Sequence, residues 1–306
     1  GTFPNGFKKY VNGVEMGMHF QKTLYGMVQA ARNWFHHLKN WMLKESKFKW
    51  TQLGSDQCVF YCTHGKEFAI ILLYVDDVIC LSTSEDLKIK IFAEIKSNFE
   101  FEDKGKLKCF LGTSIKRDRE ARRTTLDMKA NINDKLKTFE LEGAKTCTTP
   151  WPLHTTDDAG EVLNGEHATL FRAMVGSLLW VTIVRPDIAH AVSKLSSCMK
   201  EPTSNDLNMA KRCFRYLKGT IDDVLTYSMD HANVEGLLGV GYIWCPQSSS
   251  VATGYVDSNL EAPKSTTGMV FKMAGGMVMS KSKKQPITAI ATYDGEYYAF
   301  SSCSLS

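Results

Sequence analysis

The sequence has no apolar run long enough to cross a bilayer. A transmembrane helix needs roughly 18–20 apolar residues, and the longest run here, residues 68–75, is followed by two aspartates. No charged segment leads into an apolar one at the start of the chain, which disfavours a secretory signal. The nine cysteines are odd in number and show no paired spacing. We therefore expect reduced thiols in a cytoplasmic or nuclear protein that is not secreted.

The chain also lacks a strong charge imbalance and a compositional bias. Its 306 residues carry 37 basic and 33 acidic side chains, a net charge of +4, with 43% hydrophobic and 23% charged residues. These proportions disfavour disorder, collagen and coiled coil, and they allow two globular domains. The first residue is Gly1 rather than methionine, which we interpret as the sign of a fragment.

Positive charge is concentrated in two stretches of the chain. Residues 104–123 hold eight Lys or Arg and two acidic residues, and residues 262–293 hold five lysines and no acid. Two such stretches could line one path for a phosphate backbone. Solvated faces of strands or hairpins would give the same pattern, so charge alone leaves both interpretations open.

Hydrophobic periodicity predicts a helix, three strands and a second helix in the first hundred residues. The first helix is expected over residues 31–46, with a buried face formed by Trp34, Phe35, Leu38, Trp41 and Met42. Strands are expected at residues 57–62, 68–75 and 78–81, the first two forming a β-hairpin. Ser84 is the predicted N-cap of a helix that ends near Phe99.

Further elements are expected along the rest of the chain. The pattern predicts strands at 107–115 and 123–128, and helices at 132–141, 168–183, 187–199 and 205–217. Residues 146–158, rich in Thr, Pro and Asp, are the best linker candidate. Strands and helices mix without a regular βαβ repeat, so the predicted fold class is α+β.

Asp76 and Asp77 stand out because they interrupt an apolar string, residues 70–75 and 78–81. The other two Asp-Asp pairs, at 157–158 and 222–223, lie in polar contexts, and a bare pair is a weak motif. Adjacent carboxylates at the tip of an apolar hairpin need a compensating cation. Mg²⁺ (or Mn²⁺) prefers such oxygen ligands, so the sequence predicts a divalent metal site here.

At this string the sequence resembles the catalytic hairpin of reverse transcriptases, with YVDD at residues 74–77. The surroundings are similar, nearly end to end, to the Ty1/copia class of long-terminal-repeat retrotransposon polyproteins. Residues 22–34, KTLYGMVQAARNW, are similar to the family block KSLYGLKQAPRAW. Further blocks in family order are LKCFLG at 107–112, VGSLLW at 175–180, RPDIA at 185–189, RYLKGT at 215–220, KSTTG at 264–268 and SKKQP at 282–286.

The resemblance implies an RNA-directed DNA polymerase, a nucleotidyltransferase that uses two metal ions. Asp76 and Asp77 would be the palm carboxylates that hold Mg²⁺ or Mn²⁺. Tyr74 would stack against the primer terminus, and Gln29 would contact the nucleotide or template. The residues similar to the primer grip are Phe110, Leu111 and Gly112. The implied partners are an RNA template, a DNA primer, the RNA–DNA hybrid and dNTPs, with no membrane.

The resemblance also implies a partial right-hand polymerase followed by an RNase H-like α/β domain. The expected divisions are a partial palm and primer-grip region at 1–145, a helical thumb or connection region at 146–222 and a partial RNase H-like domain at 223–306. Asp257, in a block similar to YSDA, and Glu296, in a block similar to EAEY, would be catalytic metal ligands of the RNase H domain.

Three departures from the family pattern bear on activity. The first palm aspartate and the last RNase H aspartate are expected outside the 306 residues, and residues 241–254 resemble an insertion that blurs the register of Asp257. The sequence therefore leaves two hypotheses open. One is an incomplete or decayed copy of a transposable-element polymerase with RNase H, and the other is an inactive remnant that binds nucleic acid. A third alternative is a pseudogene product that is untranslated or misfolds.

Overall fold

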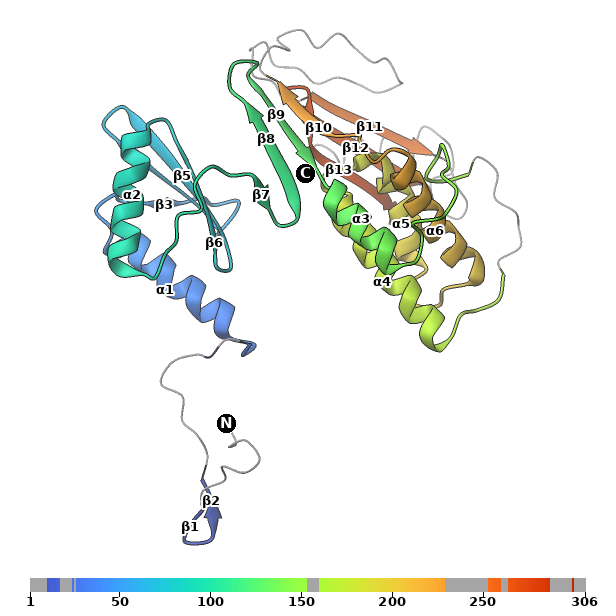
Figure 1. Ribbon diagram of the computed structural model, residues 1–306, viewed down its shortest axis with the longest axis horizontal. Coiled ribbons are helices and arrows are strands. Elements are labelled where there is room, and N and C mark those ends of the chain that lie inside the picture. The colour runs from blue at the N-terminus through green and yellow to red at the C-terminus, as the bar shows by residue number, and fades with distance from the viewer. Residues whose placement is uncertain are drawn as a thin grey trace. The chain divides into compact units, whose positions relative to one another are not determined.

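The computed structural model describes residues 10–16, 24, 26–152, 160–228, 253–259, 264–286 and 299. The chain forms two compact units, Gly1–Leu107 and Lys108–Ser306. Every strand pair among the described residues is antiparallel, and helices and strands are mixed (Figure 1). This confirms the predicted α+β class. None of the helices in the described ranges has the length and apolar character of a membrane span.

The first unit is built around a four-stranded sheet with helices on one face (Figure 1). The sheet has the order β3 (Thr51–Gln52), β4 (Val59–His64), β5 (Glu67–Tyr74) and β6 (Asp77–Ser82). The helices are α1 (Ala30–Lys44) and α2 (Glu85–Asn98), and a short hairpin of β1 (Tyr10–Val11) and β2 (Val14–Glu15) precedes them. The predicted helix, hairpin, third strand and second helix are confirmed, with shifts of a few residues at their ends.

Alternation along the strands decides which face of this sheet is covered. In β5 the side chains of Ala69, Ile71 and Leu73 are buried while their neighbours are less so. That face meets the apolar faces of the two helices, which bury Leu38, Trp41, Met42, Leu87, Ile91 and Ile95. Trp34 and Phe35, predicted as core, lie half-buried at the edge of this cluster.

The N-cap predicted at Ser84 is confirmed. Its hydroxyl accepts a hydrogen bond from the backbone N–H of Leu87 at 3.1 Å, and α2 begins at the next residue. The cap satisfies one of the helix's unpaired N–H groups. It also fixes the point at which the chain leaves β6 and enters the helical layer.

The second unit combines two sheets with four α-helices. One sheet has the order β10 (Leu225–Ser228), β9 (Arg123–Asp127), β8 (Thr113–Asp118) and β7 (Cys109–Phe110), and the other has β11 (Thr253–Asn259), β12 (Thr266–Met273) and β13 (Gly276–Lys284). The helices are α3 (Lys129–Thr138), α4 (Gly165–Val181), α5 (Ala189–Ser197) and α6 (Ser204–Gly219), with a 3₁₀ turn at Pro186–Ile188 before α5. All four helices were expected from the sequence.

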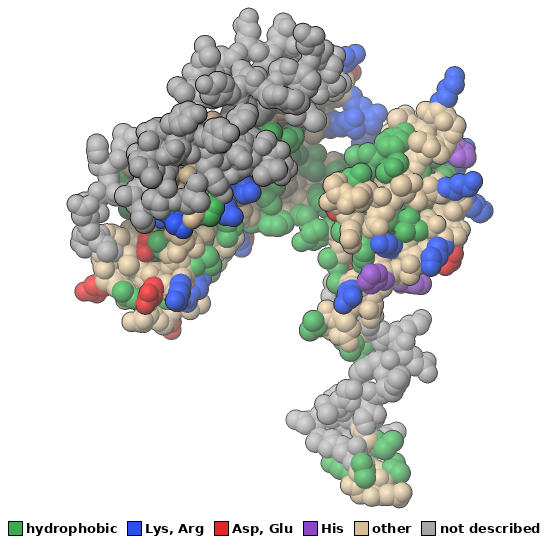
Figure 2. All heavy atoms as spheres, turned by 180° about the vertical axis from the view of Figure 1, so that it is seen from behind, with side chains coloured by type: hydrophobic (Ala, Val, Ile, Leu, Met, Phe, Trp, Pro, Cys, Tyr) green, Lys and Arg blue, Asp and Glu red, His purple; other side chains and the backbone are tan. Residues whose placement is uncertain are grey.

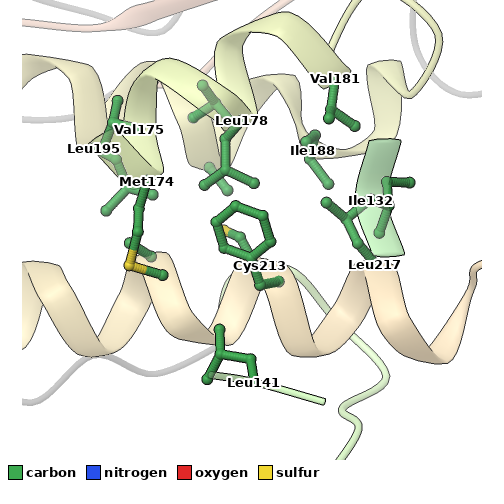
Figure 3. Packing of buried hydrophobic residues seen from close by; sticks show 14 of the residues in the cluster. Ile132, Leu141, Met174, Val175, Leu178, Val181, Ile188, Leu195, Cys213 and Leu217 are labelled. Atoms are coloured by element: carbon green, nitrogen blue, oxygen red, sulfur yellow. The ribbon is translucent and has the colours of Figure 1, made fainter. Parts of the chain in front are cut away.

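The core of the second unit lies between these helices. Figure 3 shows Leu178 of α4 directed toward α6 near Cys213, and Leu217 of α6 in the same cluster as Ile132 and Ile188. Phe171 and Phe214, among its largest side chains, are fully buried. A capping box between Thr203 and Asp206 begins α6. The four helices therefore share one buried apolar core.

The strand predicted over residues 107–115 is wrong in one respect, because a turn splits it into β7 and β8. Leu111 and Gly112 have φ angles of 50° and 77°, and Phe110 pairs with Thr113 across them. Two consecutive positive φ angles define the hairpin turn that matches the twist of the flanking strands. The apolar run is thus folded back on itself.

The described part of the predicted linker is in contact with helix α6. Residues 146–152, the described part of the linker, pack on α6: the Arg212 guanidinium donates to Thr149 Oγ1 at 2.8 Å, and the Cys213 thiol to the Pro150 carbonyl at 3.4 Å. Strand β10 pairs with β9, so strands from both sides of residue 222 share a sheet. The functional divisions at 145 and 222 stay predictions.

Candidate active site

The YVDD string forms the tip of the β5–β6 hairpin. Pairing is continuous from Ala69 with Ser82 to Tyr74 with Asp77, which leaves Val75 and Asp76 as a two-residue turn. Asp77 is the first residue of β6, and both carboxylates are exposed. The apolar sequence on either side holds the hairpin in the sheet and places the two acids at its solvent end.

The turn is strained at its first residue. Val75 has a φ of 52°, a conformation in which a β-branched side chain is a genuine outlier. Such a conformation costs on the order of 1–3 kcal/mol and persists only where surrounding contacts enforce it. One such contact is visible: the indole Nε1 of Trp34, in α1, donates a hydrogen bond to the Val75 carbonyl at 3.0 Å.

Asp76 and Asp77 are residues of a type that can contribute ligands to a magnesium ion. Within the described residues no group of three His, Cys, Asp or Glu side chains could hold a metal. Mg²⁺ commonly uses one or two carboxylates and completes its octahedron with waters and substrate phosphates. Adjacent, solvent-facing carboxylates at Asp76 and Asp77 supply that kind of partial ligand set.

Tyr74 and Gln29 lie in the same unit as the aspartates. Tyr74 is 48% exposed at the end of β5, where a planar group could reach its ring. Gln29 is the N-cap residue of α1, and its side chain is exposed. Its backbone carbonyl accepts a hydrogen bond from the N–H of Asn33 at 3.0 Å. Gln29 and Trp34 are therefore held by the same helix, α1.

The three residues similar to a primer grip form the β7–β8 turn in the second unit. Phe110 ends β7, and Leu111 and Gly112 make the turn. A methyl group placed on Gly112 would lie 3.5 Å from Asn131 Nδ2 and 3.9 Å from Trp180 Nε1. The turn therefore lies against α3 and α4, which carry those two side chains.

The two residues assigned to RNase H are described to different extents. Asp257 lies in β11, paired with Gly268 of β12. Glu296 lies outside the described residues. Their assignment as a joint metal site therefore stays a prediction.

Two features of the structure were not expected from the sequence. Trp34 was predicted to be a core residue, whereas its indole reaches the turn that carries Asp76. Arg185 and Asp187, in the RPDIA block, form a bidentate pair beside Tyr216. In the sequence, these residues are marked by lying in blocks similar to the family. Periodicity does not reveal hydrogen bonds between distant residues, so it could not predict these contacts.

Comparison with known proteins relates the first half of the chain to a family. Residues 2–152 match the sequence profile described as Reverse transcriptase (RNA-dependent DNA polymerase). The chain is 28% identical over 312 residues to the Retrovirus-related Pol polyprotein from transposon TNT 1-94 of Nicotiana tabacum, covering 97% of this chain and 22% of that protein. No solved structure matches the chain.

Two further relatives agree with this assignment. The chain is 32% identical over 205 residues to the Retrovirus-related Pol polyprotein from transposon RE1 of Arabidopsis thaliana, covering 65% of this chain and 13% of the relative. It is 24% identical over 298 residues to the Transposon Ty1-DR1 Gag-Pol polyprotein of Saccharomyces cerevisiae, covering 92% of this chain and 16% of that protein. The chain thus spans only a small part of each of these long relatives. Residues 2–152 therefore belong to the reverse transcriptase family, of the type found in Ty1/copia retrotransposon Pol polyproteins.

Proposed function

We propose that this chain is the reverse transcriptase and RNase H region of a Ty1/copia Pol polyprotein and takes part in RNA-directed DNA synthesis. The observation that supports this best is the exposed Asp76-Asp77 pair at the tip of an apolar hairpin. The family match over residues 2–152 agrees with it. The substrates would be an RNA template, a DNA primer and dNTPs.

In this proposal each residue has a separate task. Asp76 and Asp77 would hold the divalent ions, which when bound neutralise phosphate charge and favour attack by the primer 3′-hydroxyl. Tyr74 would stack on the primer terminus. Gln29 would contact the nucleotide or template. The β7–β8 turn would hold the primer strand through Phe110, Leu111 and Gly112.

The RNase H part of the proposal rests on sequence resemblance. Asp257 and Glu296 would position a water for cleavage of the RNA strand of an RNA–DNA hybrid. A protein of this kind would work in cytoplasmic virus-like particles or in the nucleus. Both the cleavage activity and the location are proposals that extend beyond the family assignment.

Metal binding tests the polymerase site without requiring turnover. Mn²⁺ is titrated into the 306-residue chain, and free Mn²⁺ is measured by electron paramagnetic resonance. We expect the Asp76→Asn, Asp77→Asn double variant to lose binding that the unaltered chain shows, because both carboxylate ligands are gone.

The exposed pair Asp222-Asp223 supplies a matched control. Asp222→Asn, Asp223→Asn removes the same charge from the second unit, where Asp222 is paired with Lys129. This variant is expected to bind Mn²⁺ as the unaltered chain does. Equal affinities in all three proteins would contradict the metal site at the hairpin.

A second candidate function is nucleic-acid binding without catalysis. The β8–β9 hairpin carries exposed basic side chains at and beside its tip: Lys116, Arg117, Arg119, Arg122 and Arg123. Lys and Arg side chains gather near this tip in Figure 2. Two acids interrupt them, and Asp118 Oδ1 is occupied by the backbone N–H of Ala121 at 2.9 Å. The tip is thus a compact cationic surface suited to phosphates.

Salt dependence tests whether this tip contacts phosphates, and primer extension separates this candidate from the first. The slope of log affinity against log salt should fall by about 0.7–0.9 for every phosphate that the protein no longer neutralises. We expect Arg119→Gln, Arg122→Gln to lower the slope for an RNA–DNA hybrid in a fluorescence anisotropy titration. Lys200→Gln, an exposed change elsewhere in the same unit, is the control. Primer extension that depends on Asp77 would contradict the purely binding role.

A further inference from the structure

The turn that carries Asp76 has an unusual residue at its first position. Two-residue hairpin turns with a positive φ at this place normally use glycine, asparagine or aspartate. Here the residue is Val75, with φ at 52° and the residue as a whole 52% exposed. Because valine resists this conformation, contacts from outside the turn must stabilise it.

Trp34 provides such a contact from a distant part of the chain. Its Nε1 lies 3.0 Å from the Val75 carbonyl oxygen, across 41 positions of sequence. The indole N–H is a donor only, so the bond has one sense: helix α1 donates and the hairpin accepts. The hydrogen bond constrains the peptide group between Val75 and Asp76.

The indole is itself held in place by the helical layer. Its ring meets Phe99 edge to face, with centroids 5.5 Å apart and an interplanar angle of 86°. Phe99 is the C-cap residue of α2, and its backbone N–H is bonded to the Ile95 carbonyl. Such aromatic pairs have a preferred geometry, so Trp34 connects the packed helices to the tip of the hairpin.

We propose that Trp34 is a positioning residue for the metal-binding carboxylates. By holding the peptide after Val75, it keeps the turn in its left-handed conformation, and with it the relative placement of Asp76 and Asp77. Release of the turn would rotate Asp76 away from Asp77 while leaving the β5–β6 pairing in place. This inference rests on the proposed function, because it assigns Trp34 to the same metal site.

The test removes the donor but keeps the ring. Trp34→Phe preserves an aromatic side chain against Phe99 and deletes the N–H. We expect Mn²⁺ to bind this variant about fivefold or more weakly, the effect of losing one hydrogen bond of ordinary strength. Trp50→Phe is the matched control, because it deletes an indole N–H bonded to Ser46 Oγ at 3.1 Å in the same unit. Its Mn²⁺ affinity should equal that of the unaltered chain.

A rescue separates positioning of the turn from general packing. Glycine adopts positive φ without steric cost, so Val75→Gly should restore Mn²⁺ affinity in the Trp34→Phe background. Unchanged affinity in Trp34→Phe would overturn the proposal. A loss that Val75→Gly fails to restore would also overturn it, since Trp34 would then act through packing alone.

A second readout works without metal. The three-bond coupling between the amide and α protons of residue 75 reports its φ angle in solution. We expect this coupling to change in Trp34→Phe and to stay constant in Trp50→Phe. If the unaltered chain bound no Mn²⁺, the proposed metal site would fail, whereas an unchanged coupling in Trp34→Phe would refute the role of Trp34 itself.

Discussion

Arg185 and Asp187 form a bidentate ion pair just after the end of α4. Arg185 Nε donates to Asp187 Oδ1 at 3.0 Å, and Nη2 donates to Oδ2 at 2.6 Å. The same guanidinium donates to the carbonyl and hydroxyl oxygens of Thr220, at 2.8 and 2.6 Å. Since Thr220 is the C-cap residue of α6, one arginine joins the ends of two core helices.

Removing this arginine should destabilise the second unit. Its side chain is 4% exposed and that of Asp187 is 35% exposed. Breaking a fully buried pair typically costs 3–5 kcal/mol, and we expect about 2–3 kcal/mol for Arg185→Met because Asp187 can partly rehydrate. Asp223→Asn is the control. That carboxylate lies 3.8 Å from Arg185 Nη2 and its side chain is 64% exposed, so the loss of stability in this variant should be much smaller.

Cys213 offers a local probe of this unfolding. It is completely buried in the core of the second unit, and burial raises the pKa of its thiol to about 12. Alkylation in urea, with the labelled peptide identified by mass spectrometry, therefore reports opening of this unit. Protection of Cys213 that is the same in Arg185→Met and the unaltered chain would contradict a stabilising role for the ion pair.

The local elements of the fold could be predicted, whereas contacts between distant residues could not. Periodicity and caps located α2 and its Ser84 cap because these signals are local in sequence. The turn at Leu111 and Gly112 was missed because an apolar run gives no sign of its φ angles. The bond between Trp34 and Val75 spans 41 positions, and no local propensity encodes it.

The candidate site shows the same division. Asp76 and Asp77 could be selected because they interrupt an apolar strand pattern, and the structure places them at a hairpin tip as that pattern implies. The function of this tip came from the resemblance, since two carboxylates alone fit many metals. What the structure adds is the strain at Val75 and its support by α1, which depend on three-dimensional packing.

Acid should weaken the Arg185–Asp187 pair at a defined pH. Burial tends to raise the pKa of Asp187, but hydrogen bonds from Arg185 and Tyr216 outweigh it and hold that pKa below its usual value. A carboxylate with a lowered pKa stabilises the fold above its unfolded pKa of about 3.9, and this contribution is lost as pH falls through the folded value. The stability difference between the unaltered chain and Asp187→Asn should therefore be constant above about pH 5 and shrink below about pH 4.

Tyr216→Phe tests the cause of this pH dependence. The Tyr216 hydroxyl donates to Asp187 Oδ2 at 2.7 Å, so its removal takes away one of the bonds that favour the ionised carboxylate. In urea titrations read by Cys213 alkylation after transfer to a common labelling pH, the acid-induced loss of stability should be smaller in this variant and should be complete at a higher pH, because the folded pKa of Asp187 lies closer to its unfolded value. If the stability of both proteins fell by the same amount over the same acidic pH range, the hydrogen bond from Tyr216 would not contribute to the lowered pKa of Asp187.

Adding the same methyl group at two glycines of the second unit should have opposite effects. Gly112 has a φ of 77°, and a methyl group there would make only ordinary contacts, at 3.5 and 3.9 Å. The cost of Gly112→Ala is therefore one of backbone conformation, about 1–2 kcal/mol for a left-handed non-glycine residue. Gly176 lies in α4 with nothing within 4 Å of an added methyl group, so Gly176→Ala should stabilise the helix by about 0.5–1 kcal/mol. Urea unfolding read at Cys213 measures both changes, and destabilisation by both alanines would contradict the conformational explanation, since only Gly112 has the left-handed backbone.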